Sequence, residues 1–290
     1  MRDTAGTMCD PDLLPLQQSP GYVAALRHLG RDVTDIHAGD GPPILMLRRR
    51  FGPTAVCYTL RADLRGARRS ALRNLPRRHF RIIIPEDYSP TGLRPSLRNG
   101  LPILTPQHVA ELNLSGSGTD DLWRGMHGKW RNRLRRALDG PLTVRGSPLE
   151  YARHAPLLHL EQTQWTKRGY SSYPLGFLAA YAETAKDQTC LIQARLNGET
   201  LAFTLFLIHG AIATYAIGWT GAEGRRIHAH NLLMWHAMTG FRDRGIRRID
   251  LGSLDTDRCR SLARFKLGCG ARARPLGPTL LIPPGVRALA

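Results

Sequence analysis

The sequence predicts an α/β fold built on a mixed α+β sheet. Residues 190–220 read as three successive strands, and Asn197-Gly198, a type I′ hairpin signal, joins the first two. A helical pattern follows at 227–245, and a strand at 246–253 begins directly after it. An antiparallel meander followed by a helix and a further strand is typical of a mixed sheet.

A Gly- and Ser-rich segment at residues 115–118 predicts a domain boundary, because a long helical pattern starts directly after it. With 290 residues, the chain is long enough for about one large or two ordinary domains. We therefore expect an N-terminal domain over 1–118 and a C-terminal domain over 119–290. The elements predicted in the N-terminal domain are strands at 42–53, 54–63 and 79–87, a basic helix at 64–78 and a further strand within 101–114.

The C-terminal domain is predicted to open with one helix over 119–140. Ser117 or Thr119 can cap this helix, and Gly140 is expected to end it. Its apolar residues recur at helical spacing and should face the core: Leu122, Met126, Trp130, Leu134 and Ala137. The other predicted elements are a strand at 142–147, helices at about 148–168 and 174–186, and a last strand near 278–283.

The charge of the chain is strongly positive, with a formal net charge of +18. Such a surface attracts polyanions, either nucleic acid or an anionic membrane face. Alternatively, the positive charge has no function and reflects compositional bias, since an arginine-rich chain can result from a GC-rich genome. Two basic segments, 61–81 and 129–140, carry arginines opposite their apolar faces. They predict nonspecific binding to the phosphate backbone of a nucleic acid. Alternatively, they are ordinary helix faces exposed to solvent.

The sequence indicates a cytoplasmic protein with reduced thiols. No apolar run approaches the ~20 residues that span a bilayer, and the N-terminus lacks the apolar region of a signal peptide. The five cysteines form no Cys-x-x-Cys pair, so we expect neither a disulfide framework nor a metal site. A weak contact with an anionic membrane is compatible with the charge. No thiol is expected to be a nucleophile, although the nearby Lys266 could depress the pKa of Cys269.

One lysine stands out, because the chain has only four. Lys266 follows Phe265 within the apolar and small-residue stretch 261–271, SLARFKLGCGA. An ammonium among apolar neighbours loses hydration, and it usually stays only where an anion comes to meet it. The alternative is a surface lysine on a β-hairpin.

Four segments together resemble the Fem-like branch of the GNAT acyltransferase superfamily. They are 15–30, 130–145, 231–253 with its Asp-Leu-Gly strand, and 264–271. The last is similar to the closing Phe-Lys…Phe-Gly signature of the branch, with Cys269 where an aromatic residue is usual. The resemblance implies two GNAT-type domains in tandem, the first of them degenerate.

The resemblance also implies an N-acyltransferase. Fem-like enzymes move an aminoacyl group from aminoacyl-tRNA onto a primary amine, so tRNA and a small-molecule or peptide amine are the expected partners, with no tightly bound cofactor. Related GNAT proteins use acyl-CoA, so an acetyl-CoA-dependent N-acetyltransferase is one alternative. A non-catalytic RNA-binding protein on a GNAT scaffold is another. The long helical hairpin that forms the tRNA-binding arm of the family has no counterpart in the sequence.

The resemblance assigns Lys266 as the electrostatic partner near the ester end of the tRNA, with Phe265 packing beside it. Amine attack on an ester or thioester creates an oxyanion and releases a proton, so the site also needs a proton acceptor. Asp250 and Tyr215 are the further catalytic candidates. For Asp250 we favour a simpler role, a strand-end residue that bonds to backbone N–H groups.

The donor and acceptor regions follow from the same comparison. The glycine-rich GNAT loop, whose N–H groups hold the CoA pyrophosphate, corresponds to residues 218–233, which lack its spacing. Arginines and a helix N-terminus could still hold an anion there. The donor-binding candidates are Gly224, Arg225, Arg226, His228, Arg131, Arg135 and Arg136. The acceptor-binding candidates are Trp165, Arg168 and Tyr170, whose aromatic and cationic groups suit an anionic or planar substrate, unless this segment is an ordinary exposed connection.

Overall fold

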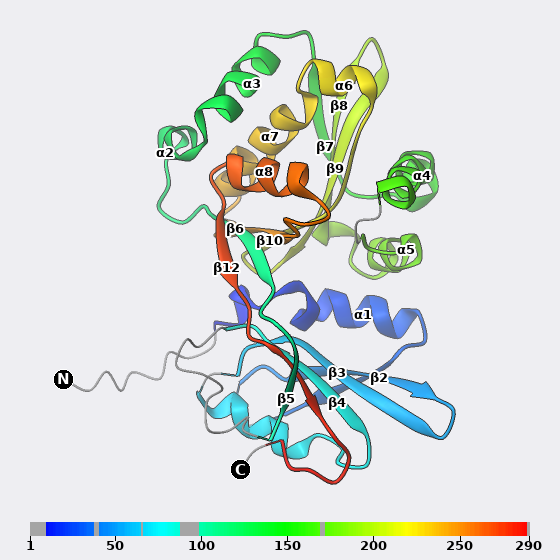
Figure 1. Ribbon diagram of the computed structural model, residues 1–290. Coiled ribbons are helices and arrows are strands. Elements are labelled where there is room, and N and C mark those ends of the chain that lie inside the picture. Colours follow the sequence, from blue (N-terminus) through cyan, green and yellow to red (C-terminus); the bar gives the residue numbers. More distant parts are fainter. Residues whose placement is uncertain (1–9, 38–40, 65, 88–98, 169–171, 289–290) are drawn as a thin grey trace, which may run out of the picture. The chain divides into compact units, whose positions relative to one another are not determined.

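The computed structural model describes residues 10–37, 41–64, 66–87, 99–168 and 172–288 (Figure 1). The chain forms two compact units: unit 1 comprises residues 1–107 and 275–290, and unit 2 comprises residues 108–274. Each unit is built on one mixed sheet. This division differs from the predicted boundary at residue 118, because the last residues of the chain belong to unit 1 and the strand before residue 114 belongs to unit 2.

Unit 1 has the strand order β1-β2-β3-β4-β13-β5. The strands β1 to β3 form an antiparallel meander, and β4 lies parallel to β3. The predicted basic helix at 64–78 is the 3₁₀ segment η3. The elements of unit 1 are η1 (Pro11–Leu13), η2 (Leu16–Gln18), α1 (Pro20–His28), β1 (Asp32–Ile36), β2 (Ile44–Phe51), β3 (Thr54–Ala62), η3 (Gly66–Asn74), β4 (Phe80–Pro85), β5 (Leu101–Leu104) and β13 (Thr279–Ile282).

Unit 2 has the strand order β12-β6-β11-β10-β9-β8-β7. Its elements are β6 (His108–Asn113), α2 (Thr119–Gly125), α3 (Gly128–Leu138), β7 (Thr143–Ser147), α4 (Tyr151–Arg168), α5 (Leu175–Thr184), η5 (Lys186–Gln188), β8 (Thr189–Leu196), β9 (Glu199–His209), β10 (Ile212–Thr220), α6 (Ala222–Arg226), α7 (Ala229–Asp243), β11 (Arg248–Ser253), α8 (Arg260–Gly268) and β12 (Arg272–Pro275). The turn between β8 and β9 has positive φ at both Asn197 and Gly198, which confirms the predicted type I′ hairpin.

The two units repeat one topology. In unit 1, α1 precedes the meander β1-β2-β3, and η3 then leads to β4, which is parallel to β3. In unit 2, α5 precedes the meander β8-β9-β10, and α6 and α7 lead to β11, which is parallel to β10. The next strand in each sheet comes from far away in the sequence, since β13 pairs with β4 and β6 pairs with β11. The predicted mixed α/β fold with a tandem arrangement is therefore confirmed.

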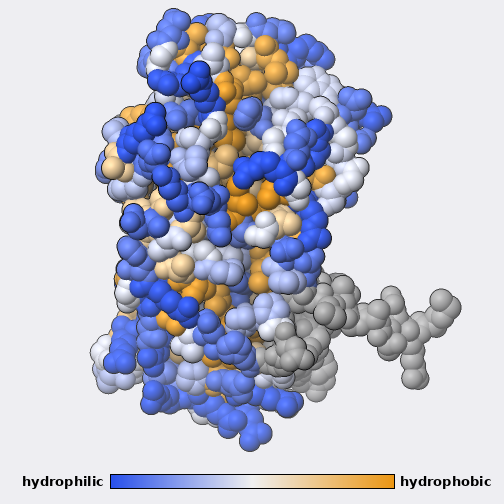
Figure 2. Space-filling model, turned by 180° about the vertical axis from the view of Figure 1, so that it is seen from behind, coloured by the Kyte–Doolittle hydropathy of each residue, from blue (hydrophilic) through white to orange (hydrophobic). Residues whose placement is uncertain are grey.

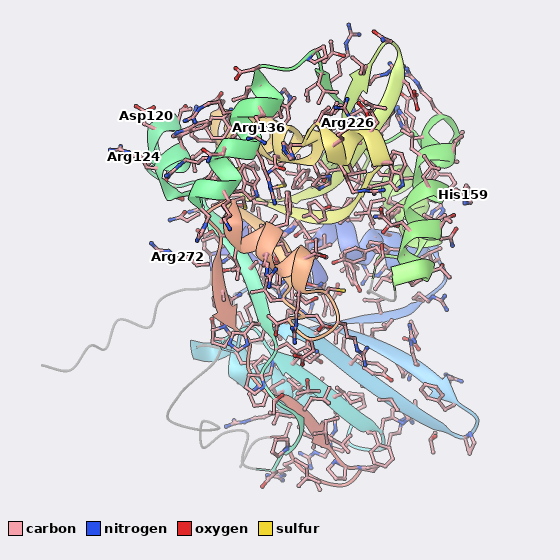
Figure 3. The ribbon with its side chains drawn as sticks, turned by 45° about the horizontal axis from the view of Figure 1, so that its top comes forward. Asp120, Arg124, Arg136, His159, Arg226 and Arg272 are labelled. Atoms are coloured by element: carbon pink, nitrogen blue, oxygen red, sulfur yellow. The ribbon has the colours of Figure 1, made fainter. Side chains whose placement is uncertain are left out.

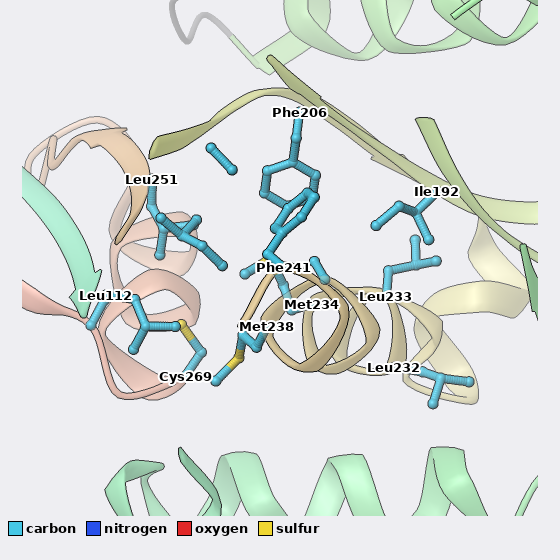
Figure 4. Close-up of a cluster of buried hydrophobic side chains, with 14 of the residues drawn as sticks. Leu112, Ile192, Phe206, Leu232, Leu233, Met234, Met238, Phe241, Leu251 and Cys269 are labelled. Atoms are coloured by element: carbon cyan, nitrogen blue, oxygen red, sulfur yellow. The ribbon is translucent and has the colours of Figure 1, made fainter. Parts of the chain in front are cut away.

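The core of unit 2 lies between the sheet and the helices α3 and α7, and Figure 4 shows part of it around Phe206 and Phe241. The helices α4 and α5 lie on the other side of the sheet (Figure 1). All five apolar residues that helical spacing placed in the core are at most 5% exposed. On the face shown in Figure 2, hydrophilic residues cover most of the surface, and apolar residues show in patches between them. Within the described ranges, no helix combines the length and apolar composition needed to span a bilayer.

The predicted helix over 119–140 is two helices, α2 and α3. The chain is extended at Met126 and His127 between them. The backbone N–H of His127 donates to the carbonyl of Gly268, the last residue of α8, at 2.9 Å. This hydrogen bond stabilises the interruption between α2 and α3. The N-cap of α2 is Gly118, whose N–H donates to the Asp121 carboxylate at 2.9 Å, and neither Ser117 nor Thr119 takes that position.

A substitution close to the C-terminus should destabilise unit 1. Leu280 is fully buried on β13, whereas its neighbour Leu281 is half-buried. We expect Leu280→Ala to cost about 2–5 kcal/mol and Leu281→Ala clearly less. Hydrogen exchange should accelerate in β3 and β4 of the Leu280→Ala protein, while β8 to β10 keep their protection. Faster exchange confined to unit 2 would contradict this assignment of β13.

Candidate active site

The candidate site lies where the parallel ladder between β10 and β11 ends. The two strands pair only over three rows, from Ile212↔Arg248 to Thr214↔Asp250. Directly after the last row, β10 has a register shift between Tyr215 and Ile217 against β9. The register of β11 against β6 also shifts after Asp250. The catalytic candidates Tyr215 and Asp250 are therefore brought to the end of the same ladder.

Lys266 lies on helix α8, so the β-hairpin alternative is wrong. Its side chain is buried, with 7% exposure, and Nζ donates to the Ser253 carbonyl at the end of β11 at 2.8 Å. Burial lowers the pKa of Lys266 to about 8, and the Asp250 carboxylate opposes that shift. The side chain is thus a desolvated ammonium at neutral pH that can lose its proton under mildly basic conditions.

Asp250 shapes the end of β11. Its side chain is 1% exposed, and Oδ1 accepts from the backbone N–H of Gly252 at 2.7 Å. Gly252 has a φ of +73°, a conformation that glycine adopts without strain. This is the strand-end role that we favoured from the sequence. The negative charge of this carboxylate also raises the pKa of Lys266 and so opposes the effect of burial.

Tyr215 belongs to a hydrogen-bonded chain of three side chains. Its Oη lies 3.1 Å from His230 Nε2, and His230 Nδ1 lies 3.1 Å from Thr220 Oγ1. Burial lowers the pKa of His230 to about 4, so the imidazole is neutral at pH 7, with one N–H donor and one acceptor nitrogen. A Cβ at Gly218 would overlap Tyr215 Oη, so this position requires glycine. His230 is not among the site residues predicted from the sequence. A glycine inside an apolar strand, Gly218, was the available sign of a close approach at this point.

Aromatic rings connect this chain to the helix of Lys266. The Phe265 ring lies 5.1 Å from the His230 ring and 5.8 Å from the Trp130 ring, measured between centroids. A Cβ at Gly268 would come within 2.7 Å of Trp130, so α8 packs closely against α3. The resemblance predicts that Phe265 packs beside Lys266, and the rings that Phe265 contacts belong to α3 and α7. Its part in catalysis stays a prediction.

The glycines of the expected donor loop pack against β9. The N–H of Gly221 donates to the Leu201 carbonyl at 2.9 Å, and a Cβ at Gly224 would lie 2.5 Å from the same oxygen. Among the arginines that follow, Arg225 donates to the Thr220 carbonyl, and Arg226 pairs with Glu223. Close packing therefore explains Gly224 without a ligand.

The arginines of α3 have different roles. Arg131 donates to the backbone carbonyls of Arg124 and Met126, both at 3.0 Å, and Arg135 lies over the Trp123 ring. Arg136 is exposed, and Figure 3 shows it on α3 beside the region of α6 that carries Arg226.

His228 directly precedes α7, and the positive charges of α3 act on its side chain. Burial lowers its pKa, and the charges of Arg133 and Arg136 lower it further. His228 adopts a left-handed φ of 57°. The charges of Arg133 and Arg136 therefore reach the turn between α6 and α7, whereas Arg131 and Arg135 contact α2 and the segment that follows it. Sequence reasoning did not single out Arg133.

Comparisons with known proteins identify the domain family of the segment that carries most of these residues. Residues 126–266, from the end of α2 to Lys266, match the family described as an acetyltransferase (GNAT) domain. The chain contains a GNAT acetyltransferase domain. The predicted superfamily and the predicted acyltransferase class are thereby confirmed.

Solved structures show a similar fold over nearly the whole chain. FemX is 13% identical, with 94% of each chain covered and a TM-score of 0.73. L-PGS from Bacillus licheniformis is 15% identical, with 97% of this chain and 94% of that chain covered and a TM-score of 0.53. A tandem GNAT protein from the clavulanic acid biosynthesis pathway is 14% identical, covers 96% of this chain and 88% of its own, and has a TM-score of 0.50. At these identities the similarity is one of fold. No curated protein sequence matches the chain.

The acceptor candidates of the GNAT domain are only partly described. Trp165 is half-buried on α4. Arg168 is the last residue of α4, and its side chain lies outside the described part of the structure, as does the whole of Tyr170. Close by, Tyr173 stacks on Phe177 with 5.4 Å between ring centroids. The acceptor assignment stays a prediction.

The thiol of Cys269, close to Lys266 in the sequence, is not activated. Cys269 is fully buried, and its thiol donates to the Lys266 carbonyl at 3.0 Å. Burial raises the pKa of Cys269 to about 12, so the expectation that Lys266 could depress it is wrong. Cys57, Cys190 and Cys259 form no disulfide, and Cys9 lies outside the described residues. No group of potential metal ligands comes together in the described part of the chain.

The protonation of Lys266 can be measured directly, because the chain has only four lysines. In a protein with ¹³C-labelled lysine, one Cε resonance should titrate near pH 8 and should vanish in Lys266→Met. Asp250→Asn should lower this pKa further, since the Asp250 charge raises it. The buried cation also makes stability rise with pH between about 8 and 10.5, because the unfolded chain binds this proton up to the higher value. Titration of Lys266 near 10.5 would contradict its burial.

Proposed function

We propose that the GNAT domain transfers an aminoacyl group from aminoacyl-tRNA onto a primary amine of a small molecule or peptide. The observation that carries this proposal is the desolvated ammonium of Lys266 at the end of the β10–β11 ladder. A buried positive charge at a fixed position can stabilise an oxyanion more strongly than the same charge in water, because water screens it less.

The proposed reaction forms one bond and breaks one. The neutral amine nitrogen attacks the ester carbonyl carbon, and a tetrahedral oxyanion forms beside the Lys266 ammonium. Collapse of this intermediate breaks the bond between the carbonyl carbon and the ribose oxygen. The amine loses a proton, and the ribose oxygen gains one. Tyr215 can supply that proton and be reprotonated, since its hydroxyl is bonded to the neutral His230 ring.

The charge around the α6–α7 turn supports a polyanionic donor. Arg133 and Arg136 act on His228 from α3, and both are exposed. Arg225 is exposed on α6 beside the same turn. A phosphate backbone would lie against these groups, whereas a CoA pyrophosphate is usually held by loop N–H groups. The Gly221 N–H already donates to the Leu201 carbonyl, so fewer backbone N–H groups of this loop remain to hold a pyrophosphate.

The role of Lys266 can be tested with a variant that keeps its volume. Lys266→Met should lower the turnover number roughly 10²–10³-fold, the usual effect of losing one oxyanion partner. Lys266→Arg should restore little, because a planar guanidinium does not replace a compact ammonium. Lys129 is an exposed lysine on α3, so Lys129→Met is the matched control and should leave turnover unchanged. Near wild-type turnover of a folded Lys266→Met protein would refute the assignment.

The nature of the donor can be tested by salt dependence. Each phosphate that the protein neutralises on duplex nucleic acid contributes about 0.9 to the slope of log affinity against log salt. The KM for aminoacyl-tRNA should therefore rise steeply with salt, and Arg133→Gln/Arg136→Gln should flatten the slope by about two such contributions. Arg272→Gln removes an exposed charge on β12 and should not change the slope.

Three results would count against aminoacyl-tRNA. Turnover with acetyl-CoA and none with charged tRNA would favour an N-acetyltransferase. A flat salt series would also argue against a phosphate-bound donor. Tight tRNA binding without transfer to any amine would favour a non-catalytic RNA-binding protein.

A further inference from the structure

A pocket separate from the candidate active site lies between the second half of α7, the edge strand β7 and its neighbour β8. Its volume is about 390 Å³, which is within the range of pockets that hold small-molecule ligands. None of the catalytic or donor-binding candidates lines it. The residues that determine its character are Gly146, Cys190, Ile192, Gly240, Phe241 and Arg244.

Two glycines keep the pocket open. Gly240 lies inside α7, where glycine is less favourable than alanine. A Cβ at Gly240 would meet no atom within 4 Å. Gly146 lies in β7, and a Cβ there would touch Cys190 Sγ and Ile192 Cγ1, both at 3.9 Å, so larger side chains would cover the thiol. Neither glycine has a positive φ, and their effect is the space that they leave.

One guanidinium provides positive charge to this pocket. The Arg244 guanidinium lies 5.9 Å from the centroid of the Phe241 ring, and it acts on the Cys190 thiol by opposing the rise in the pKa of that thiol. A thiol is a weak acceptor, and no carboxylate of the described residues lies within ion-pair distance of Arg244. A guanidinium prefers a carboxylate or phosphate as its partner.

The other polar groups restrict the charge of a ligand. Burial raises the pKa of Cys190 above its ordinary value, so the thiol is protonated at neutral pH and acts as a small apolar surface. Burial lowers the pKa of His236, so its ring is uncharged and can donate one N–H. The Asp187 carboxylate also lines the pocket and would repel a second negative charge.

We propose that this pocket binds a small monocarboxylic acid with an apolar body. The carboxylate lies on the guanidinium of Arg244, and the body lies against Ile192, Ala237 and Phe241. A phosphate ester or nucleotide does not fit, since the pocket offers one cationic group and one opposing carboxylate. The site is additional to the transfer reaction and does not depend on its donor.

Benzoate and its neutral analogue benzamide are the probes for this site. Saturation-transfer NMR should detect benzoate binding to the wild-type protein in the millimolar range or tighter. Benzamide should bind at least tenfold more weakly. Arg244→Gln keeps the size of the side chain and should weaken benzoate roughly ten- to a hundredfold, the effect of losing a charged hydrogen bond. Arg145→Gln removes an exposed charge of β7 outside the pocket and should have no effect.

The shape of the pocket can be tested by filling it. Gly240→Leu should abolish benzoate binding, whereas Gly240→Ala should keep it and raise the melting temperature. As an independent readout, benzoate should slow the alkylation of Cys190 by iodoacetamide and leave that of Cys259 unchanged. Absence of benzoate binding, equal affinity for benzamide, or an unchanged affinity in Arg244→Gln would each overturn the proposal. Failure of benzoate to protect Cys190 would overturn it even if Gly240→Leu does not fold.

Discussion

The structure of the candidate site depends on one buried cation. The Lys266 ammonium is removed from water and is held by the Ser253 carbonyl, with the Asp250 carboxylate supporting its charge. Burying an ammonium is unfavourable unless such partners are supplied. Asp250 also bonds to the Gly252 N–H, so one carboxylate both shapes the end of β11 and stabilises the charge. The end of β11 and helix α8 therefore fix each other.

Close packing connects the buried lysine to other side chains of the GNAT domain. Phe265, the neighbour of Lys266, packs on His230 and Trp130. His230 in turn holds Tyr215 and Thr220 by its two ring nitrogens. Three glycines, at positions 218, 224 and 268, make these contacts possible, because a Cβ at each would collide with a neighbour. The positions of the reactive side chains thus depend on residues that have no chemistry of their own.

Local patterns predicted the elements whose signals are local. The hairpin at Asn197-Gly198, the helix α7 and the buried positions of α2 and α3 follow from turn chemistry and periodicity. Helix α8 was missed because it is short, lacks a side-chain cap, and ends in a glycine-rich stretch. The sequence analysis also did not predict that β6 joins the sheet of unit 2 and that β13 joins the sheet of unit 1. Both placements rest on pairing between segments that are far apart in the sequence.

Side-chain roles were harder to predict than elements. Lys266 and Phe265 came from a resemblance, and the structure places both at one end of the sheet. Arg131 and Arg135 looked like phosphate ligands on a basic helix, yet their partners are backbone carbonyls and an indole ring. Such partners come from tertiary packing and are invisible to helical periodicity.

Lys266 is inferred to act as a charged ammonium whose pKa is lowered by burial and partly restored by Asp250. The pH dependence of kcat, measured with the donor that supports turnover, tests this inference. We expect kcat to fall as pH rises through about 8, the pKa of Lys266, and we expect this limb to move to lower pH in Asp250→Asn. A falling limb that stays in place in Asp250→Asn, or that persists in Lys266→Met, would rule out this role of Lys266.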